Sequence, residues 1–469
     1  MLTDFIGRAK NLTKEGLALL LRNAPLPLTV SLLARMLQDQ RADGGIAPAE
    51  QRPAGGRTIT ILALSPENFR GDLEALAATP DVRVITLSEL WLLRLLYCFY
   101  ATTTTLRMYS SFFDPTPDDP AYAAKRRYRA FLNKVLPPLF RRFGIDCVIG
   151  YHLHHVADVD WGAVSEQLGF PYVIIQRECL FASDHVARYT VERMQRLGRF
   201  EGAHVAVHNE VSVKTFETSG FVERDRMSIL GAIRMDGYIR RLLGRKDPAA
   251  ARPKATLFAF AVSSVYREEM AVFFADVHLT FVRLAQENPG VDFVIKYKNN
   301  VGPTWLRDFD VACVAASLDP TVLPNLTITG TADPQDLIVE SSVVAGFNST
   351  TLLEAGIAGK NVVVPLFDVM ANPGMRGFLY FPDKLDVFNV AESLEAFHAL
   401  VMDAVENHRE VADDVMARRR AMFEEYVSSL DGDATSKHLL LLRDLVAARQ
   451  SKGLRAGWVK STDYATERP

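Results

Sequence analysis

The sequence has few cysteines, and their spacing gives no sign of a metal site or a disulfide framework. The four occur without a Cys-x-x-Cys pair or close histidine clustering, at Cys98, Cys147, Cys179 and Cys313. An excess of one charge is missing as well, because 53 basic and 56 acidic residues leave a formal net charge of −3. No overall field therefore attracts nucleic acid or other polyions.

Long apolar runs and the common nucleotide-binding signatures are also missing. No run of about 18 apolar residues is uninterrupted, which argues against a spanning helix. Two apolar stretches, 16–37 and 90–113, contain prolines or arginines; we interpret them as core helices, with contact to a membrane surface as the alternative. Neither Gly-x-Gly-x-x-Gly nor a P-loop motif occurs, which disfavours dinucleotide oxidoreductases and P-loop enzymes.

The N-terminus does not show the order of basic, apolar and small-residue regions that a signal peptide has. We therefore expect a cytoplasmic protein, placed at the inner face of the cytoplasmic membrane if one of the two apolar stretches binds lipid.

What the sequence does contain is an alternation of short apolar strands with helices. Its length of 469 residues favours two domains, and hydrophobic and charged contents of 48% and 23% are typical of globular proteins. Strands that are apolar throughout predict parallel sheets covered on both faces. We expect an α/β protein with a helical extension and linker (1–56), a first Rossmann-like domain (57–245), a second (254–390), and C-terminal helices with a tail (391–469).

One segment of the second domain has the composition of an anion site. The apolar stretch 343–346 ends in Gly346, Phe347, Asn348, Ser349 and Thr350, and a helix with Glu354 follows. Small hydroxyl residues at a helix N-terminus after a buried strand are suited to phosphate, and Glu354 to a ribose diol. The alternative is a capped helix whose Ser349 and Thr350 satisfy only their own backbone, with Glu354 as a solvated surface residue.

This segment resembles the nucleotide-binding region of GT-B glycosyltransferases and their relatives, the UDP-GlcNAc 2-epimerases and CDP-glycerol glycerophosphotransferases. The matching residues are Gly346, Ser349, Thr350, Glu354, Ala355, Gly359, Lys360 and Pro365. The stretches 200–238 and 431–442 are similar to the hinge and the tail helix of bacterial surface-carbohydrate enzymes of this class. The resemblance covers roughly 144–442 and implies a GT-B architecture, two Rossmann-like domains facing across a cleft.

The resemblance also implies roles for individual residues. Ser349 and Thr350 bind the donor phosphate and Glu354 the donor ribose, while Gly346 allows close approach of the backbone and Asn348 or Ser349 caps the helix. Lys296 stands where such enzymes often have Lys before a His-Pro pair and would neutralise charge on the leaving group. Tyr297, Lys298 and Asn299 replace that pair, so the CMP, CDP or UDP identity of the donor stays open. Three polar residues, Ser263, Ser264 and Arg267, follow the first strand of the second domain. They either bind a diphosphate or form an ordinary helix cap.

The first domain should supply the acceptor site and a general base. Polar residues follow two of its strands, and we expect the base to be Glu178, with His152 and Asp184 as further candidates. Arg177 is suited to an acidic acceptor or to a carboxylate of the donor sugar. Although His152, His154 and His155 lie near Asp158, no fourth ligand has convincing spacing, so we expect no metal.

We therefore expect a glycosyltransferase of bacterial surface glycans, such as capsule or lipopolysaccharide, which is inverting and metal-independent. Its partners are a nucleotide-sugar donor and a glycan or lipid-linked acceptor, with no nucleic acid and no resident cofactor. A CDP-glycerol-type polyol-phosphate transferase and a sugar-nucleotide epimerase are alternatives. A non-catalytic GT-B-like protein that binds a glycan or a partner is a third.

Overall fold

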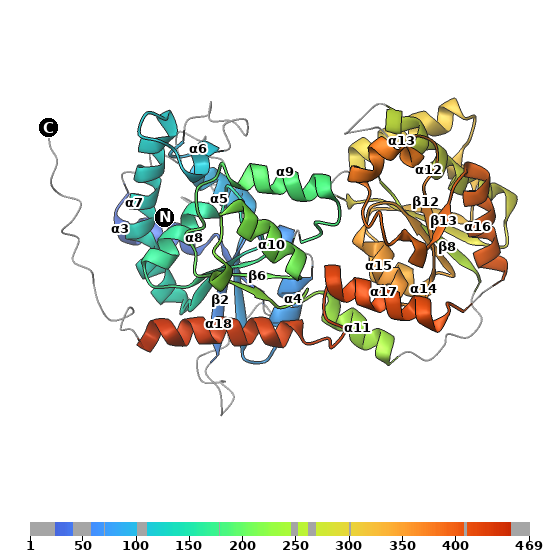
Figure 1. Ribbon diagram of the computed structural model, residues 1–469. Helices are drawn as coiled ribbons and strands as arrows, with labels where there is room; N and C mark the ends of the chain where they lie inside the picture. Colours follow the sequence, from blue (N-terminus) through green and yellow to red (C-terminus); the bar gives the residue numbers. More distant parts are fainter. Residues whose placement is uncertain are drawn as a thin grey trace. The chain divides into compact units, whose positions relative to one another are not determined.

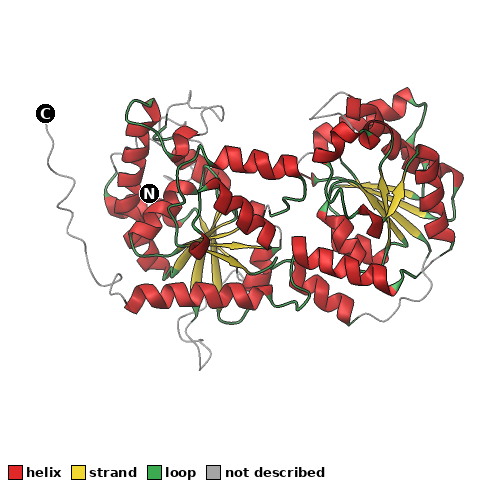
Figure 2. Ribbon diagram, viewed as in Figure 1, coloured by secondary structure: helices red, strands yellow, loops and turns green. Residues whose placement is uncertain are grey.

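The computed structural model describes residues 24–40, 58–69, 71–100, 110–177, 179–244, 252–260, 269–299, 302–407 and 410–451. The chain forms two compact units. Unit 1 comprises Met1–Cys179, Val191–Asp236 and Asp433–Pro469, and unit 2 comprises Leu180–Thr190 and Gly237–Gly432. Each unit contains its own sheet with helices on both faces (Figure 1, Figure 2).

In its described part, unit 1 has one seven-stranded sheet in the order β1-β3-β2-β4-β5-β6-β7. All neighbouring strands are parallel except β1, which pairs antiparallel with β3. The strands are β1 (Leu37–Asp39), β2 (Ile59–Leu64), β3 (Val82–Leu87), β4 (Cys147–Gly150), β5 (Tyr172–Ile175), β6 (His204–Val207) and β7 (Met227–Ile229).

Helices connect these strands, and the ends of one of them show capping. The longest is α7 (Pro120–Phe143), where the Asp119 side chain accepts from the Ala121 N–H at its start and Gly144, at φ 67°, ends it. The other helices that lie at least partly in unit 1 are α3 (Leu26–Ala34), α4 (Asp72–Ala77), α5 (Glu89–Leu96), α6 (Ser110–Phe113), α8 (Val159–Gln167), α9 (Asp184–Met194), α10 (Glu210–Ser219), α11 (Met235–Leu243) and α18 (Ala434–Ser451).

The described part of unit 2 contains a six-stranded, fully parallel sheet in the order β10-β9-β8-β11-β12-β13. Its strands are β8 (Lys254–Phe258), β9 (Asp292–Lys296), β10 (Leu326–Thr329), β11 (Val343–Gly346), β12 (Asn361–Pro365) and β13 (Asn389–Ala391). The helices around it are α12 (Glu269–Glu287), α13 (Gly302–Ala315), α14 (Pro334–Glu340), α15 (Thr350–Ile357), α16 (Leu394–Glu406) and α17 (Asp413–Tyr426).

The prediction of two doubly wound α/β domains is confirmed, because each unit has an open sheet of buried parallel strands with helical crossovers. The C-terminal helices do not form a group of their own. Helix α17 packs on α15 in unit 2. Leu439, Leu442 and Val446 of α18 join the core that covers the sheet of unit 1. Figure 1 shows α18, in red, lying along that unit.

The apolar stretches considered for membrane contact are only partly described. Residues 16–23 and 101–109 lie outside the described residues. Helices α3 and α5 contribute Leu32, Leu33, Leu92 and Leu95 to buried positions, as core helices do. None of the described helices is both long enough and apolar enough to cross a membrane.

Candidate functional site

Each sheet has a topological switch point, where two adjacent strands lead to connections in opposite directions. In unit 1 this point lies between β2 and β4, and in unit 2 between β8 and β11. Ligands of open parallel sheets bind beyond the carboxyl ends of the strands at such points. Functional residues are therefore expected in the loops that follow these four strands.

At the switch point of unit 1, Ser65 follows β2 directly and its side chain is fixed. It is fully buried and its backbone adopts φ 52°, ψ 56°, an uncommon conformation for a residue other than glycine. The Ser65 Oγ donates to Asp158 Oδ1 at 2.7 Å, and Asp158 comes from the loop after β4. The two strand ends are thus joined by one short buried hydrogen bond.

His155 lies between two carboxylates. Its Nδ1 is 3.2 Å from Asp158 Oδ1, and its Nε2 is 3.2 Å from Oε1 of Glu89, which begins α5 just after β3. Burial by itself would lower the pKa of His155, but Asp158 and Glu89 outweigh it and raise the pKa to about 10. The hydrogen bond with His155 in turn lowers the pKa of Glu89. The resting imidazole is therefore a cation with both ring nitrogens engaged.

The arrangement is a carboxylate-oriented imidazole that opens toward solvent at one side. Asp158 is fully buried, His155 keeps 15% of its side-chain surface exposed, and Glu89 keeps 35%. The Asp158 Oδ2 atom makes no hydrogen bond with a described residue, while Asn68 holds the other oxygen of Glu89 at 3.0 Å. Such a pair can accept a proton at Nε2 once Glu89 moves away, because Asp158 fixes the ring through Nδ1.

The other two histidines of this loop are not bases at neutral pH. Burial, followed by the charge of His155, lowers the pKa of His152 to about 3, and burial also lowers the pKa of His154. Their rings meet edge to face with centroids 4.0 Å apart. Within the described residues, no group of three or more His, Cys, Asp or Glu side chains is arranged to hold a metal ion.

Arg177 is used to hold unit 1 together. It is buried, its Nε lies 3.3 Å from Asp72 Oδ2, and its Nη1 donates to the carbonyl of Asn68. The same Asp72 accepts from the Arg234 N–H at 2.9 Å. Arg177 therefore fixes the loop after β2, the strand that Ser65 follows. A role of Arg177 in binding an acidic substrate stays a prediction.

The remaining predicted acid and base residues are dispersed. Asp184 is exposed at the first residue of α9, in the segment that belongs to unit 2, whereas His152 lies in unit 1. Glu178 lies outside the described residues. The catalytic roles of these three residues stay predictions.

At the switch point of unit 2, α15 begins with a capped and partly open N-terminus. Ser349 accepts from the Thr351 N–H at 3.3 Å and from the Thr351 hydroxyl at 2.8 Å. Ser349 and Thr350 are partly exposed. Gly346 packs closely, since a Cβ there would lie 3.2 Å from the Leu352 side chain. The N-terminus of α15 thus keeps the features of a phosphate site, with Ser349 also serving its own backbone.

Asn348 and Glu354 differ from what spacing alone indicates. Asn348, at φ 47°, donates to the carbonyl of Phe378 at 2.9 Å and accepts from the Tyr380 N–H at 2.8 Å, so its side chain anchors a neighbouring loop. Glu354 is only 4% exposed, so the interpretation of it as a solvated surface residue is wrong. Its role toward a donor ribose stays a prediction.

The two lysines of the resemblance are engaged with backbone carbonyls. Lys296 donates to the carbonyls of Tyr297 at 2.6 Å and Gly330 at 3.0 Å. Lys360 is buried at the amino end of β12 and donates to the carbonyls of Val339 and Ser341, at 2.7 and 2.6 Å. Lys360 is therefore a structural residue. Ser263, Ser264 and Arg267 lie outside the described residues.

Sequence reasoning missed Ser65 and Glu89, and it considered His155 and Asp158 only as possible metal ligands. The signal was present, because Ser65 follows β2 and Glu89 follows β3 within two residues. The rule that polar residues at strand ends mark sites was applied to other strands only.

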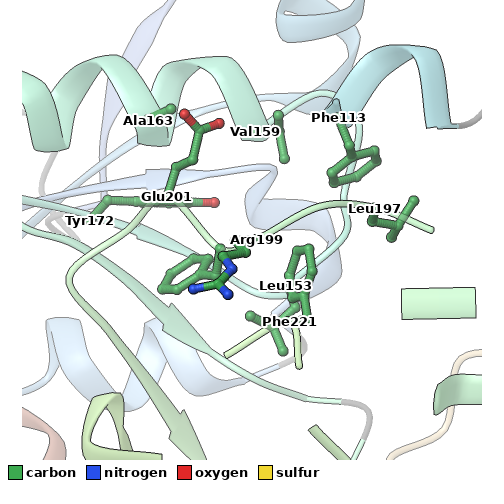
Figure 3. Close-up of a pocket in the computed structure, with 10 residues that line it drawn as sticks. Phe113, Leu153, Val159, Ala163, Tyr172, Leu197, Arg199, Glu201 and Phe221 are labelled. Atoms are coloured by element: carbon green, nitrogen blue, oxygen red, sulfur yellow. The ribbon is translucent and has the colours of Figure 1, made fainter. Parts of the chain in front are cut away.

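A small cavity lies elsewhere in unit 1 (Figure 3). Its volume is about 20 Å³, and its walls include Phe113, Leu153, Tyr172, Phe200 and Phe221. A space of this size holds about one water molecule. It is too small for a sugar or a nucleotide.

No protein family model matches the sequence, and neither does any curated protein. Among solved structures, UDP-GlcNAc 2-epimerase from Neisseria meningitidis bound to UDP-GlcNAc has 14% identity and a TM-score of 0.46, over 82% of this chain and 100% of that one. Trehalose 6-phosphate synthase from Burkholderia multivorans has 14% identity and a TM-score of 0.45, over 86% and 100%. The wall teichoic acid polymerase TagF has 10% identity and a TM-score of 0.46, over 84% and 90%. These proteins have GT-B-type folds, and likeness at this level concerns the fold alone.

Proposed function

We propose that this chain is a glycosyltransferase that moves a sugar from a nucleotide-activated donor to a hydroxyl of a surface glycan such as capsule or lipopolysaccharide. The observation that carries the proposal is the His155 imidazole, oriented by buried Asp158 at the switch point of unit 1. The donor assignment is supported by the small-residue N-terminus of α15 and by the sequence resemblance of that segment.

In this proposal the acceptor hydroxyl takes the place of Glu89 at His155 Nε2. Loss of one neighbouring carboxylate lowers the pKa of His155 toward the range in which an imidazole releases and accepts protons near neutrality. As Glu89 leaves, the imidazolium gives its Nε2 proton to the Glu89 carboxylate and becomes neutral. The proton of the acceptor hydroxyl then passes to the free Nε2 as the hydroxyl oxygen attacks the anomeric carbon. The bond from that carbon to the nucleotide phosphate breaks, and its electron pair leaves with the phosphate. Because the hydroxyl attacks from the face opposite this bond, the configuration of the carbon is inverted.

The donor binds through its phosphates to unit 2. The N–H groups at the start of α15 and the hydroxyls of Ser349 and Thr350 stabilise the charge that develops on the leaving phosphate. Glu354 is assigned to the ribose diol.

The donor site is tested by thermal unfolding of the full chain with CMP, CDP, UMP, UDP, GDP or ADP. A ligand at about 100 times its Kd stabilises the native state by about 2.7 kcal/mol. We expect one nucleotide to raise the Tm, and Ser349→Ala and Glu354→Gln to reduce this effect. Ser393→Ala is the control, because Ser393 caps α16 by accepting from the Ala396 N–H at 3.0 Å. A folded chain that no nucleotide stabilises would point to the non-catalytic alternative.

The catalytic pair is tested separately by release of nucleotide from the donor in the presence of acceptor glycan. His155→Gln should abolish turnover while the nucleotide still raises the Tm. His398→Gln is the control, because His398 lies on α16 and its Nε2 is 3.0 Å from Oε2 of Glu287. Unchanged turnover in His155→Gln would exclude the proposed base. Conversion of the nucleotide sugar without any acceptor would instead favour an epimerase.

A further inference from the structure

Helix α7 carries an unusual distribution of charge. Among its 24 residues are seven Lys or Arg and no Asp or Glu, although the whole chain has a net charge of −3. Two of the cations, Lys125 and Arg129, point inward and bind the buried Asp160 at 2.7 and 2.6 Å. This buried pairing fixes the rotation of the helix about its own axis and so decides which residues face outward.

The other five cations form what we call the α7 basic face. All are exposed, and none makes an ion pair with a described residue: Arg126, Arg127, Lys134, Arg141 and Arg142. Three of them recur every seven residues, at 127, 134 and 141, which places them along one line of an α-helix. The nearest acids in sequence are engaged elsewhere: Asp119 caps the helix, and Asp146 is buried and accepts from the Thr60 N–H at 2.8 Å. The face extends over much of a helix about 36 Å long.

We propose that the α7 basic face binds the surface of an anionic lipid membrane. A row of exposed cations matches a surface of anionic headgroups, each cation near such a surface strengthening binding about fivefold. Helix α3, which packs against α7, begins with Leu26, which is 46% exposed between two exposed prolines. An exposed apolar residue on the helix that packs against a basic helix fits the boundary between headgroups and acyl chains better than it fits a soluble polyanion.

The orientation of α7 gives this contact a use. Lys125 and Arg129, in the first half of α7, bind Asp160 in the first turn of α8, which follows β4. The first half of α7 therefore lies toward the carboxyl edge of the unit 1 sheet, the edge that holds Ser65 and His155. Arg126 and Arg127 are in this half of the helix, so membrane contact there brings lipid-linked acceptors to this side of unit 1. The lipid contact itself does not depend on the proposed chemistry.

The test is co-sedimentation of the full chain with vesicles of phosphatidylcholine alone or mixed with phosphatidylglycerol, at low and at 0.5 M salt. We expect binding only to the anionic vesicles, weakened by salt. The triple variant Arg127→Gln, Lys134→Gln, Arg141→Gln should bind roughly 100-fold more weakly, from three factors of about five. Arg188→Gln, Lys214→Gln, Arg420→Gln is the control, since it removes three exposed cations from other helices.

Equal losses in the two triple variants would show a general charge effect and overturn the assignment to α7. Absence of binding to anionic vesicles would overturn the membrane proposal, and retention of the chain on heparin under the same conditions would point to a soluble polyanion instead. A Tm within about 2 °C of wild type confirms that the variants are folded, so that a loss of binding is read as loss of the surface.

Discussion

Replacement of Glu89 by glutamine isolates one of the two carboxylates that hold His155. The substitution keeps the side-chain shape but removes the charge 3.2 Å from Nε2 and leaves Asp158 in place at Nδ1. An opposite charge at this distance shifts a pKa by about 1 to 3 units. Because 35% of the Glu89 side chain is exposed and solvent screens its charge, we expect the pKa of His155 to fall by about 1 to 2 units from its wild-type value of about 10.

The assay is an NMR titration of the histidine ring protons of the full chain. The chain has 10 histidines, and the resonance of His155 is the one that disappears in His155→Gln. Glu67→Gln is the control, because Glu67 accepts from the backbone N–H of Glu89 at 3.2 Å, away from the Glu89 carboxylate that faces His155. A wild-type pKa near the ordinary 6.5, or the same pKa in wild type and Glu89→Gln, would refute the paired arrangement.

The same pair predicts how stability depends on pH. The folded pKa of His155 is raised, so its stabilising contribution is complete below about pH 6.5 and is lost as pH rises toward about 10. Within that window this one group lowers the free energy of unfolding by about 1.4 kcal/mol per pH unit. In Glu89→Gln the upper end of the window should move down with the pKa, which urea unfolding monitored between pH 6 and 10 will detect.

Two further predictions concern buried cations that serve the fold. Asp160→Asn leaves Lys125 buried without its carboxylate at 2.7 Å, and should lower the free energy of unfolding by about 3 to 5 kcal/mol. Glu201→Gln, at the exposed end of the same network, is the control and should cost less than about 1 kcal/mol. Similar losses in the two variants would contradict the structural role of the buried pair. Lys360→Met removes two buried hydrogen bonds, and should destabilise unit 2 by about 2 to 3 kcal/mol in urea unfolding while the nucleotide that stabilises wild type still raises the Tm.

Most of the secondary structure was predictable because buried parallel strands are apolar at every position. The apolar patterns at 58–66, 82–87, 147–152 and 172–178 predict strands, and they correspond to β2, β3, β4 and β5. Two strands of three residues, β1 and β13, are too short for any periodicity and were missed. The unit against which α18 packs could not be predicted either, since a helical pattern does not indicate which of two sheets the helix covers.

The sequence by itself determined that polar residues stand at strand ends, that α15 begins with small hydroxyl residues, and that α7 contains seven Lys or Arg and no Asp or Glu. Only the tertiary structure decided which of these residues meet. Ser65, Glu89 and Asp158 follow three different strands, and the order β3-β2-β4 brings them together around His155. Spacing also does not give the direction of a long side chain. Asn348 therefore looks like a ligand in the sequence. In the folded chain its side chain instead binds backbone groups of a neighbouring loop, because burying such groups without partners is costly.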